Sequence, residues 1–211
     1  MLGEVLADAF ADDPVFAWLI PPDARGREGR LRTFFTSMSR TYLRQGKPCY
    51  LTAPAPAAPA PAAHAPAAHA PAAHAPAAHA SAAALWAGPG RWSLPLVQMA
   101  LESAPQGLAF RGNLLRALRV QIQIERLHAR HTSAPHWYLG YLGARHDHQG
   151  QGLGSQLLRE VLAGADADGI PAYLESSNER NLPLYERNGF RVVGELRALG
   201  RGPTIYRMWR E

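Results

Sequence analysis

The sequence predicts an α/β protein of the α+β type, in which helices flank one mixed sheet. Stretches with apolar residues at helical spacing alternate with short runs rich in aromatic and β-branched residues. This alternation is clearest from Trp137 to the C-terminus, where the last two runs predict a closing hairpin. A glycine-rich stretch, residues 145–158, also joins a predicted strand to a predicted helix. Such alternation favours a single mixed sheet covered by helices.

The N-terminal quarter predicts two helices and a strand. Residues 2–13 are amphipathic, and we expect this helix to end at Pro14, because proline cannot continue a helix. A longer helix is predicted over residues 25–43, with Leu31, Phe34, Phe35, Met38 and Leu43 as its apolar positions. The sequence PCYLT, residues 48–52, then predicts a short strand.

Residues 53–84 consist almost entirely of alanine, proline and histidine. Tandem copies of PAAHA begin at Pro61, Pro66, Pro71 and Pro76. Proline at this density prevents helix formation and alanine has little surface to bury, so we expect a disordered insertion within a single domain, residues 1–211. Its histidines recur every five residues and share no helical face, so we expect no metal site. The role of the repeat stays open.

The remaining elements follow in order. Residues 81–87, which overlap the end of the insertion, predict a partner strand that stops at the GPG turn. Residues 94–130 have helical spacing, with Leu114, Leu115, Leu118, Ile122 and Leu127 near one face. After them we expect a strand at 137–144, a helix at 152–165, a strand at 171–176, a short helix at 182–188, and the hairpin strands 190–198 and 203–209.

Composition limits the partners. The net charge is +5, and arginine supplies nearly all of it because Lys47 is the only lysine. The arginines are dispersed, which suits a small phosphorylated ligand and predicts no nucleic-acid partner. The single Cys49 excludes an internal disulfide and fits a reducing compartment. With no leader pattern and no lipophilic run of about 18 residues, we expect no membrane partner and a cytoplasmic protein.

The sequence RHDHQGQGLGSQLL, residues 145–158, predicts an anion site. Its glycines fall at the N-terminus of a predicted helix, where unpaired backbone N–H groups favour a pyrophosphate. A P-loop would need a lysine, and a dinucleotide loop would need a third glycine where Ser155 or Leu157 stands. A third pattern, Gln/Arg-x-x-Gly-x-Gly/Ala, is satisfied by Gln149, Gly152 and Gly154.

That third pattern resembles the acyl-CoA loop of the GNAT superfamily of N-acetyltransferases. Downstream, AYLESSNERNLPLYERNGF resembles the next motif of the superfamily, with Tyr185 four residues before Gly189 and Phe190. With WYLGYLGARHDHQGQGLGS and AAALWA, the likeness narrows to the puromycin N-acetyltransferase group and covers most of the chain outside the insertion. It implies a mostly antiparallel sheet that splays at the acyl-CoA site.

The sequence departs from this family in two places. The family opens with a strand before its first helix, which raises the expectation of a missing edge strand or a misassigned start. Relatives commonly have a hydrophobic residue and a proline before the loop, where this chain has ARHDH, and this puts the path of the chain into the loop in doubt.

The resemblance implies acetyl-CoA as co-substrate and no metal. Backbone groups of Leu142, Gly143 and Ala144 would pair with the pantetheine arm. The pyrophosphate would be wrapped by Gln149, Gly150, Gln151, Gly152, Leu153, Gly154 and Ser155. Asn178 and Asn181 are candidate partners of the pantetheine amides, and Asn181 as a simple helix cap is the open alternative.

The chemistry implied is attack of a neutral amine on a thioester. By resemblance Tyr185 would protonate the departing sulfur, and a packed structural tyrosine is the alternative. Glu175 is the candidate base, directly or through water, provided that burial raises its pKa; a structural anion is the alternative. A backbone N–H near Ala144 would stabilise the oxyanion. The first helices and the region of Trp86, Trp92 and Phe110 would bind the acceptor, whereas His136 and His148 are expected at the surface or in loops.

We therefore expect an enzyme that acetylates a primary amine of a small molecule. A puromycin-like aminonucleoside, and with it antibiotic resistance, is the acceptor that the resemblance implies. A non-catalytic acyl-CoA-binding or regulatory module, and an enzyme acting on protein amines, are the alternatives. The oligomeric state stays open.

Overall fold

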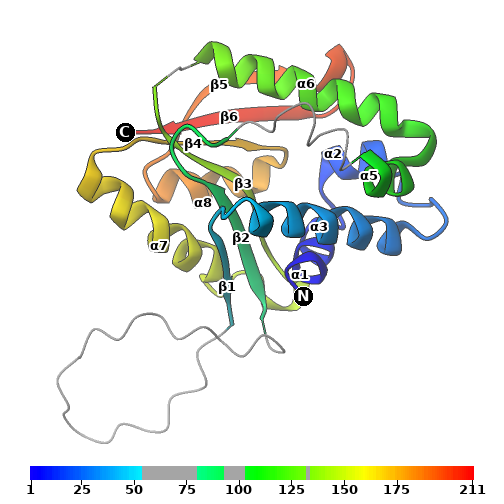
Figure 1. The fold of residues 1–211 in the computed structure, drawn as a ribbon, viewed down its shortest axis with the longest axis horizontal. Coiled ribbons are helices and arrows are strands. Elements are labelled where there is room, and N and C mark those ends of the chain that lie inside the picture. Colours follow the sequence, from blue (N-terminus) through cyan, green and yellow to red (C-terminus); the bar gives the residue numbers. More distant parts are fainter. Residues whose placement is uncertain (54–79, 93–102, 132–133) are drawn as a thin grey trace, which may run out of the picture.

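The computed structural model describes residues 1–53, 80–92, 103–131 and 134–211 (Figure 1). The insertion predicted at residues 53–84 therefore lies largely outside the described residues, as does the start of the helical stretch predicted at 94–130. None of the described helices combines the length and apolar character needed to cross a bilayer.

Six strands form one sheet in the order β1-β2-β3-β4-β6-β5. They are β1 (Cys49–Thr52), β2 (Ala82–Ala87), β3 (Trp137–Ala144), β4 (Ala172–Ser176), β5 (Arg191–Arg197) and β6 (Thr204–Arg210). Only β3 and β4 pair in parallel, so the predicted mixed and mostly antiparallel sheet is confirmed. The end of the predicted disordered tract was wrong, because Ala82 to Ala84 lie in β2 with no exposed surface.

The two central strands part halfway along their length. Pairing of β3 with β4 begins at Trp137 with Ala172 and stops at Leu139 with Leu174. Beyond that point β3 stays paired with β2 as far as Ala144, and β4 stays paired with β6 as far as Ser176. The edge of β3 that faces β4 is thus left without a strand partner over residues 140–144, among the described parts of the chain. This is the splay that the sequence predicts.

Helices cover both faces of the sheet, as Figure 1 shows. They are α1 (Leu2–Ala9), α2 (Pro14–Leu19), α3 (Arg27–Arg44), α5 (Ser103–Phe110), α6 (Leu114–His131), α7 (Leu153–Asp168) and α8 (Leu182–Arg187). Alternate residues of β2 separate the layers, because successive strand side chains point to opposite faces. Ala83 and Leu85 belong to the core with α1 to α3, whereas Ala84 and Trp86 belong to the core with α7.

Pro14 begins a helix instead of ending one. Helix α1 already ends at Ala9, and α2 starts at Pro14 with Asp13 as its N-cap. The Asp13 carboxylate accepts hydrogen bonds from the backbone N–H groups of Val15 at 2.9 Å and Phe16 at 3.0 Å. Proline is favoured at the first helical position because its missing N–H would have no partner there anyway.

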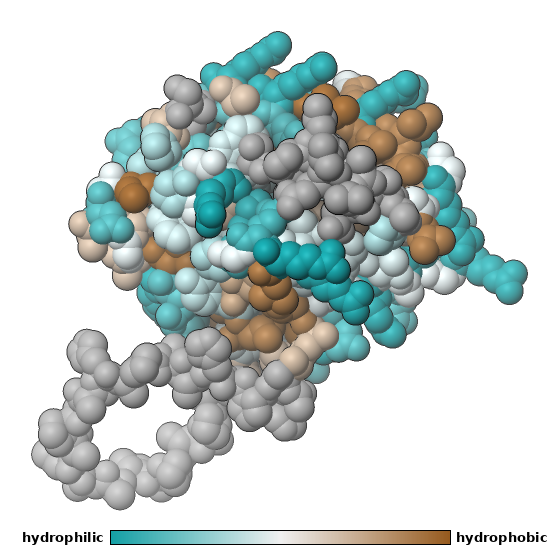
Figure 2. Space-filling model, viewed as in Figure 1, coloured by the Kyte–Doolittle hydropathy of each residue, from teal (hydrophilic) through white to brown (hydrophobic). Residues whose placement is uncertain are grey.

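The predicted buried face of α6 was partly wrong. Leu115 is 68% exposed and Ile122 is 39% exposed, whereas Val120 and His128 are buried. Val120 packs on Leu196, Ala198 and Ile205 of the last hairpin. Helix α6 carries more than one apolar stripe, and contact with this hairpin selects which one is covered. Figure 2 shows the surface of the molecule in the orientation of Figure 1. On the face in view, most of the coloured surface is polar or neutral, and hydrophobic residues form separate groups.

Candidate active site

A cavity of about 200 Å³ lies where β3 and β4 part. Its walls are supplied by α2, α3 and α6, with Phe110 of α5, Tyr185 of α8 and the splayed strands. Its lining is rich in aromatic rings, namely Phe10, Phe16, Phe34, Tyr42, Trp92, Phe110, Tyr138, Tyr141 and Tyr185. Glu175 and Tyr185, the predicted catalytic pair, both line it, as do Leu142 and Asn181.

Glu175 lies on β4 with its side chain only 6% exposed. Burial raises the pKa of its carboxyl to about 7, against the opposing effects of Tyr138, Tyr173 and Arg207. Its Oε1 atom accepts no hydrogen bond from the described residues, and no described arginine forms an ion pair with it. Glu175 lines the cavity, and a pKa of about 7 allows its carboxyl to exchange a proton near neutral pH.

The imidazole of His128, on α6, faces that free oxygen, with Nδ1 4.0 Å from Glu175 Oε1. His128 Nε2 lies 2.6 Å from His136 Nε2, and His136 Nδ1 lies 2.7 Å from the carbonyl oxygen of Ala134. A carbonyl only accepts, so His136 Nδ1 carries a hydrogen, and its Nε2 accepts one from His128 Nε2. His128 Nδ1 is then left with a lone pair toward Glu175, which suits a protonated carboxyl.

Both histidines are buried, and burial lowers the pKa of His128 to about 3 and lowers the pKa of His136. Each ring therefore stays neutral at physiological pH, which the hydrogen-bond directions above require. His136 lies in the loop before β3, as one of its two expected alternatives has it, but it is 1% exposed and so is not at the surface. The buried pair was missed because it joins α6 to the residue before β3, a contact that sequence spacing does not reveal.

Tyr185 lies on α8, where its ring packs against Phe190 with the ring centroids 6.2 Å apart. Burial, with a smaller effect from Asp13, raises the pKa of its phenol well above the ordinary value. The phenol therefore keeps its proton at physiological pH, as a general acid must. The structure thus combines the two alternatives, since the ring is packed in the core and also lines the cavity.

The glycine loop leads into α7. Gly150 and Gly152 have φ values of +76° and +79°, in the left-handed region that favours glycine, and open space surrounds the position of a Cβ at each. Gly152 is the N-cap of α7 and no side chain caps that end. A Cβ on Gly154 would lie 3.2 Å from Leu184, so this glycine allows α7 and α8 to approach closely. The first N–H groups of α7, on Leu153, Gly154 and Ser155, thus face an uncapped end.

Side-chain amides stabilise the backbone around this loop. Gln149 Nε2 donates to the carbonyl oxygen of Ala144 at 3.3 Å, and Gln151 Nε2 donates to that of Asp147 at 3.3 Å. The side chain of Ser155 is 3.4 Å from Asn188 Nδ2. The predicted loop residues therefore come together at one end of α7, beside the unpaired edge of β3.

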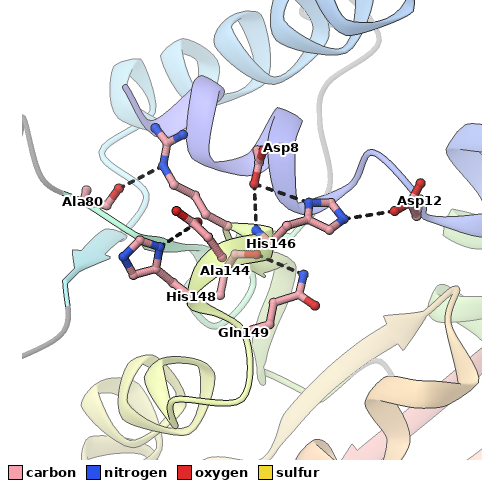
Figure 3. Close-up of polar contacts among 9 residues, drawn as sticks. Asp8, Asp12, Ala80, Ala144, His146, His148 and Gln149 are labelled. Carbon is pink, nitrogen blue, oxygen red and sulfur yellow. Dashed lines mark hydrogen bonds and ion pairs between the residues drawn. The ribbon is translucent and has the colours of Figure 1, made fainter.

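The unusual ARHDH segment ties the start of the loop to α1 (Figure 3). His146 donates its backbone N–H to Asp8 Oδ2 at 2.9 Å, and its ring contacts Asp8 at 3.4 Å and Asp12 at 3.0 Å. Burial opposes the charged ring, but the hydrogen bonds with Asp12 and Asp8 outweigh it and raise the pKa of His146. Arg145 Nε donates to the carbonyl oxygen of Ala80 at 3.3 Å. His148 contacts only the neighbouring Asp147 among the described residues.

Both asparagines stand at the start of a helical segment. Asn178 caps the short 3₁₀ turn Glu179–Asn181, accepting from the N–H of Arg180 at 3.1 Å. Asn181 occupies the N-cap position of α8, as its structural alternative expects, but its side chain makes no capping hydrogen bond and the residue lines the cavity.

Among the aromatic residues expected to bind the acceptor, Trp92 and Phe110 line the cavity. Trp86 does not, because it is fully buried and packs edge-on against Trp137. Three charged residues outside the predicted site, Asp13, Lys47 and Glu125, also line the cavity. The Asp-Pro start of α2 was a sequence signal for Asp13, and the only lysine of the chain was a signal for Lys47.

The chain was compared with protein families, curated proteins and solved structures. Residues 111–190 match the acetyltransferase (GNAT) family. Over 54 residues the chain is 43% identical to an uncharacterized N-acetyltransferase of Schizosaccharomyces pombe. The matched segment is 26% of this chain and 22% of that protein. The chain thus spans about a fifth of the length of this curated relative.

Two solved structures share the fold across nearly the whole chain. A crystal structure of histone acetyltransferase HPA2 and related acetyltransferase from Corynebacterium glutamicum covers 99% of this chain and 88% of its own, at 21% identity and a TM-score of 0.60. The polyamine N-acetyltransferase of Drosophila melanogaster covers 97% and 90%, at 15% identity and a TM-score of 0.55. At these identities the likeness concerns the fold. Residues 111–190 thus match the acetyltransferase (GNAT) family, and the chain as a whole shares the fold of solved acetyltransferases.

Proposed function

We propose that this protein transfers the acetyl group of acetyl-CoA to a primary amine of a small molecule. The observation that carries the proposal is the meeting of Glu175 and Tyr185 in one cavity at the splay of β3 and β4. One group exchanges a proton near neutral pH and the other retains its proton. Amine acylation needs both, since the attacking ammonium must lose a proton and the departing thiolate must gain one.

The unpaired edge of β3 supports the binding of acetyl-CoA. Backbone groups of alternate residues point to opposite edges of a strand, so those of Leu142 and Ala144 point toward the side from which β4 has diverged, whereas Gly143 pairs with Ala83 of β2. A pantetheine arm carries amides, and it would add to the sheet there as an extra strand. The uncapped start of α7, with residues 149–155, would hold the pyrophosphate. Asn181, whose side chain makes no capping hydrogen bond, and the donor side of Asn178 would bind the pantetheine amides. The protein needs no metal for this chemistry.

Within the cavity, Glu175 would take the proton of the acceptor ammonium, directly or through water. The lone pair of His128 Nδ1 suits the carboxyl once it is protonated. Tyr185 would then protonate the sulfur, and a backbone N–H near Ala144 would stabilise the oxyanion. Each of these assignments is a proposal about this chain's own residues.

The aromatic lining favours an acceptor with a ring-containing body. A puromycin-like aminonucleoside is one such amine, and its acetylation would amount to antibiotic resistance. An amine on a protein is the second candidate acceptor, but the small and mostly aromatic cavity favours a free molecule. We also propose that residues 1–211 act as one domain, since the sheet joins elements from both ends of the chain.

The test is mass spectrometry of the products formed from acetyl-CoA and a panel of amines. The panel contains puromycin, aromatic amino acids and their decarboxylated amines, polyamines and a lysine peptide. Acetylation of a free amine with matching release of CoA is expected. Acetylation of the peptide alone would overturn the small-molecule assignment, and tight binding of acetyl-CoA with no product would favour a non-catalytic acyl-CoA-binding module.

Tyr185→Phe tests the assignment of the acid. Because the substitution removes one hydroxyl and keeps the packed ring, we expect unchanged affinity for acetyl-CoA and a turnover number lower by about 100-fold. An unchanged turnover number would remove Tyr185 from the acid role.

A further inference from the structure

The cavity contains a buried cation that the proposed acetyl transfer does not use. Lys47 is the only lysine of the chain, is 6% exposed, and lines the same cavity as Glu175. Among the described residues no carboxylate pairs with its ammonium group, whose recorded contact is the ring of Tyr42, 5.0 Å from Nζ to the ring centroid. Burial, with a like charge on Arg91, lowers the pKa of Lys47.

The position of Lys47 is fixed by the way α3 ends. Gly46 adopts a left-handed φ of +63°, its N–H donates to the carbonyl oxygen of Leu43 at 3.1 Å, and the N–H of Lys47 donates to that of Tyr42 at 2.9 Å. This pair of hydrogen bonds is the Schellman arrangement, which reverses the chain directly after a helix. The reversal turns the following residue back toward the helix, and so Lys47 lies beside Tyr42 instead of extending into solvent.

Tyr42 in turn packs closely on β3. Its hydroxyl occupies the space that a Cβ on residue 140 would fill, and that residue is Gly140. The Lys47 ammonium is thereby held near the part of β3 that lines the cavity. Its position is a consequence of α3 docking on the splayed strand.

An unpaired buried charge is costly unless a partner compensates it. The Tyr42 ring compensates partly, because the electron-rich face of an aromatic ring attracts an ammonium group. The acidic residues of the cavity, Asp13, Glu125 and Glu175, form no ion pair with Lys47. Asp13 caps α2, and Glu125 accepts a hydrogen bond from Gln121 at 2.9 Å. A ligand with an anionic group would pair with the Lys47 ammonium and so compensate its buried charge.

We infer that the amine acetylated by this protein carries a carboxylate, and that Lys47 binds that carboxylate while the amine lies at Glu175. The inference rests on the proposed function and narrows its substrate class to amino acids or similar acids with a ring-containing body. Lys47 and Glu175 line one cavity whose walls are largely aromatic, so a ligand that carries an acid, an amine and a ring is complementary to it. Puromycin-like aminonucleosides have no acidic group and do not meet this requirement.

The experiment compares tyrosine with tyramine, which differ by the carboxylate. The measured quantity is the ratio of kcat/KM for tyrosine to kcat/KM for tyramine. We expect a ratio of at least ten in the natural protein, a fall of at least tenfold in Lys47→Met, and retention of most of the preference in Lys47→Arg. Arg40→Met, which removes an exposed cation from the same helix as Tyr42, is the control and should leave the ratio unchanged.

A ratio near one in the natural protein, or the same ratio in Lys47→Met, would overturn the inference. So would an acetyl group found on Lys47 itself, because the residue would then be an acceptor; peptide mass mapping identifies it, since it distinguishes the only lysine from the N-terminal amine. Loss of fold in Lys47→Met would show in circular dichroism. The inference would then be tested by the ratio of kcat/KM values in the natural protein and in Lys47→Arg.

Binding measurements keep this inference separate from the proposed function. Calorimetry with acetyl-CoA, and product analysis over the whole panel, test acetyl transfer. Calorimetry with N-acetyltyrosine and N-acetyltyramine tests the role of Lys47 without turnover. The acid should bind at least tenfold more tightly to the natural protein, and Lys47→Met should abolish the difference; equal affinities would overturn the inference even if acetyl transfer is observed.

Discussion

At the scale of single residues, the environment of Glu175 determines both its ability to exchange a proton and its effect on the stability of the fold. Its carboxyl is buried with one oxygen unpaired, and its pKa is raised to about 7 from an ordinary 4.5. A raised pKa means that the folded protein prefers the protonated form. The favourable contribution is therefore complete below the unfolded value of 4.5 and is lost as the pH rises through about 7.

Glu175→Gln should separate stability from activity. The amide is neutral at every pH and can donate to the lone pair of His128 Nδ1, so the melting temperature should exceed that of the natural protein at pH 8 and match it near pH 5. Acetyl transfer should fall by about 100-fold or more, because the amide cannot accept a proton. Differential scanning calorimetry at the two pH values, with a turnover assay, checks both parts. Equal melting temperatures at pH 8 would show that the carboxyl is not destabilised by burial.

At the scale of elements, the start of α7 is defined by backbone conformation. Gly152→Ala places a side chain at a φ of +79° and should lower the free energy of unfolding by about 1 kcal/mol. The new methyl group projects into open space at the proposed pyrophosphate site, so the Kd for acetyl-CoA should rise severalfold.

Gly164→Ala is the matched control in the same helix. It lies at an exposed interior position with no atom within 4 Å of a Cβ, so alanine should raise stability by roughly 0.5 to 1 kcal/mol. The Kd for acetyl-CoA should not change. Equal effects of the two substitutions on cofactor affinity would contradict the assignment of the loop.

The contact between α1 and the start of the loop depends on pH through His146. Its pKa is raised in the folded state, so the stabilisation is complete below the ordinary value of 6.5 and is lost as the pH rises through the folded value. His146→Gln should therefore lower the melting temperature more at pH 5.5 than at pH 9. The side chain is 45% exposed, which limits the effect to about 1 kcal/mol or less.

His148→Gln serves as the control for this pH dependence. His148 lies in the same turn, but its hydrogen bond is with the adjacent Asp147. Loss of this bond therefore removes no contact between the loop and another helix or strand. The difference between the two variants should shrink as the pH rises. A difference that is independent of pH would exclude protonation of His146 as its cause.

Local signals in the sequence predicted most elements and the loop. The strands β3 to β6 and the place of the glycine loop before α7 follow from spacing and turn residues that act over a few positions, whereas the place of Tyr185 followed from the resemblance. What failed depends on contacts between distant segments. The covered stripe of α6 is chosen by the last hairpin, His136 is buried by its bond to His128, and Trp86 is enclosed by α7 and Trp137. The periodicity of a helix or strand does not show which distant segment of the chain packs against it.

At the scale of the whole molecule, the sheet brings together segments that are far apart in the chain. Its central strand β3 pairs with β2 on one side and begins a parallel pair with β4 on the other. Helices from the N-terminal segment cover one face, and α7 with α8 covers the opposite one. The cavity at the splay thus receives Asp13 from one end of the chain and Tyr185 from near the other.

The chain between β1 and β2 offers a test of how much sequence this architecture needs. Thr52 pairs with Ala82, and the N–H of Ser81 donates to the carbonyl oxygen of Thr52 at 2.8 Å, so the ends of the two strands are adjacent. Deleting residues 54–79 would leave Ala53, Ala80 and Ser81 as the link, a length that joins hairpin strands readily. Ala80 would still accept the hydrogen bond from Arg145.

We expect this deletion to leave the Kd for acetyl-CoA unchanged. It should raise the free energy of unfolding by about 1 to 2 kcal/mol, because a shorter loop costs less entropy to close. Replacing the same residues with an equally long Gly/Ser segment is the control, which should match the natural protein in stability. Calorimetry and chemical denaturation measure the two quantities. A large loss of acetyl-CoA affinity in the deletion, but not in the Gly/Ser variant, would show that the site requires the length of this connection. Loss in both variants would show instead that residues 54–79 themselves contribute to binding, and that the acetyl-CoA site extends beyond the splayed sheet.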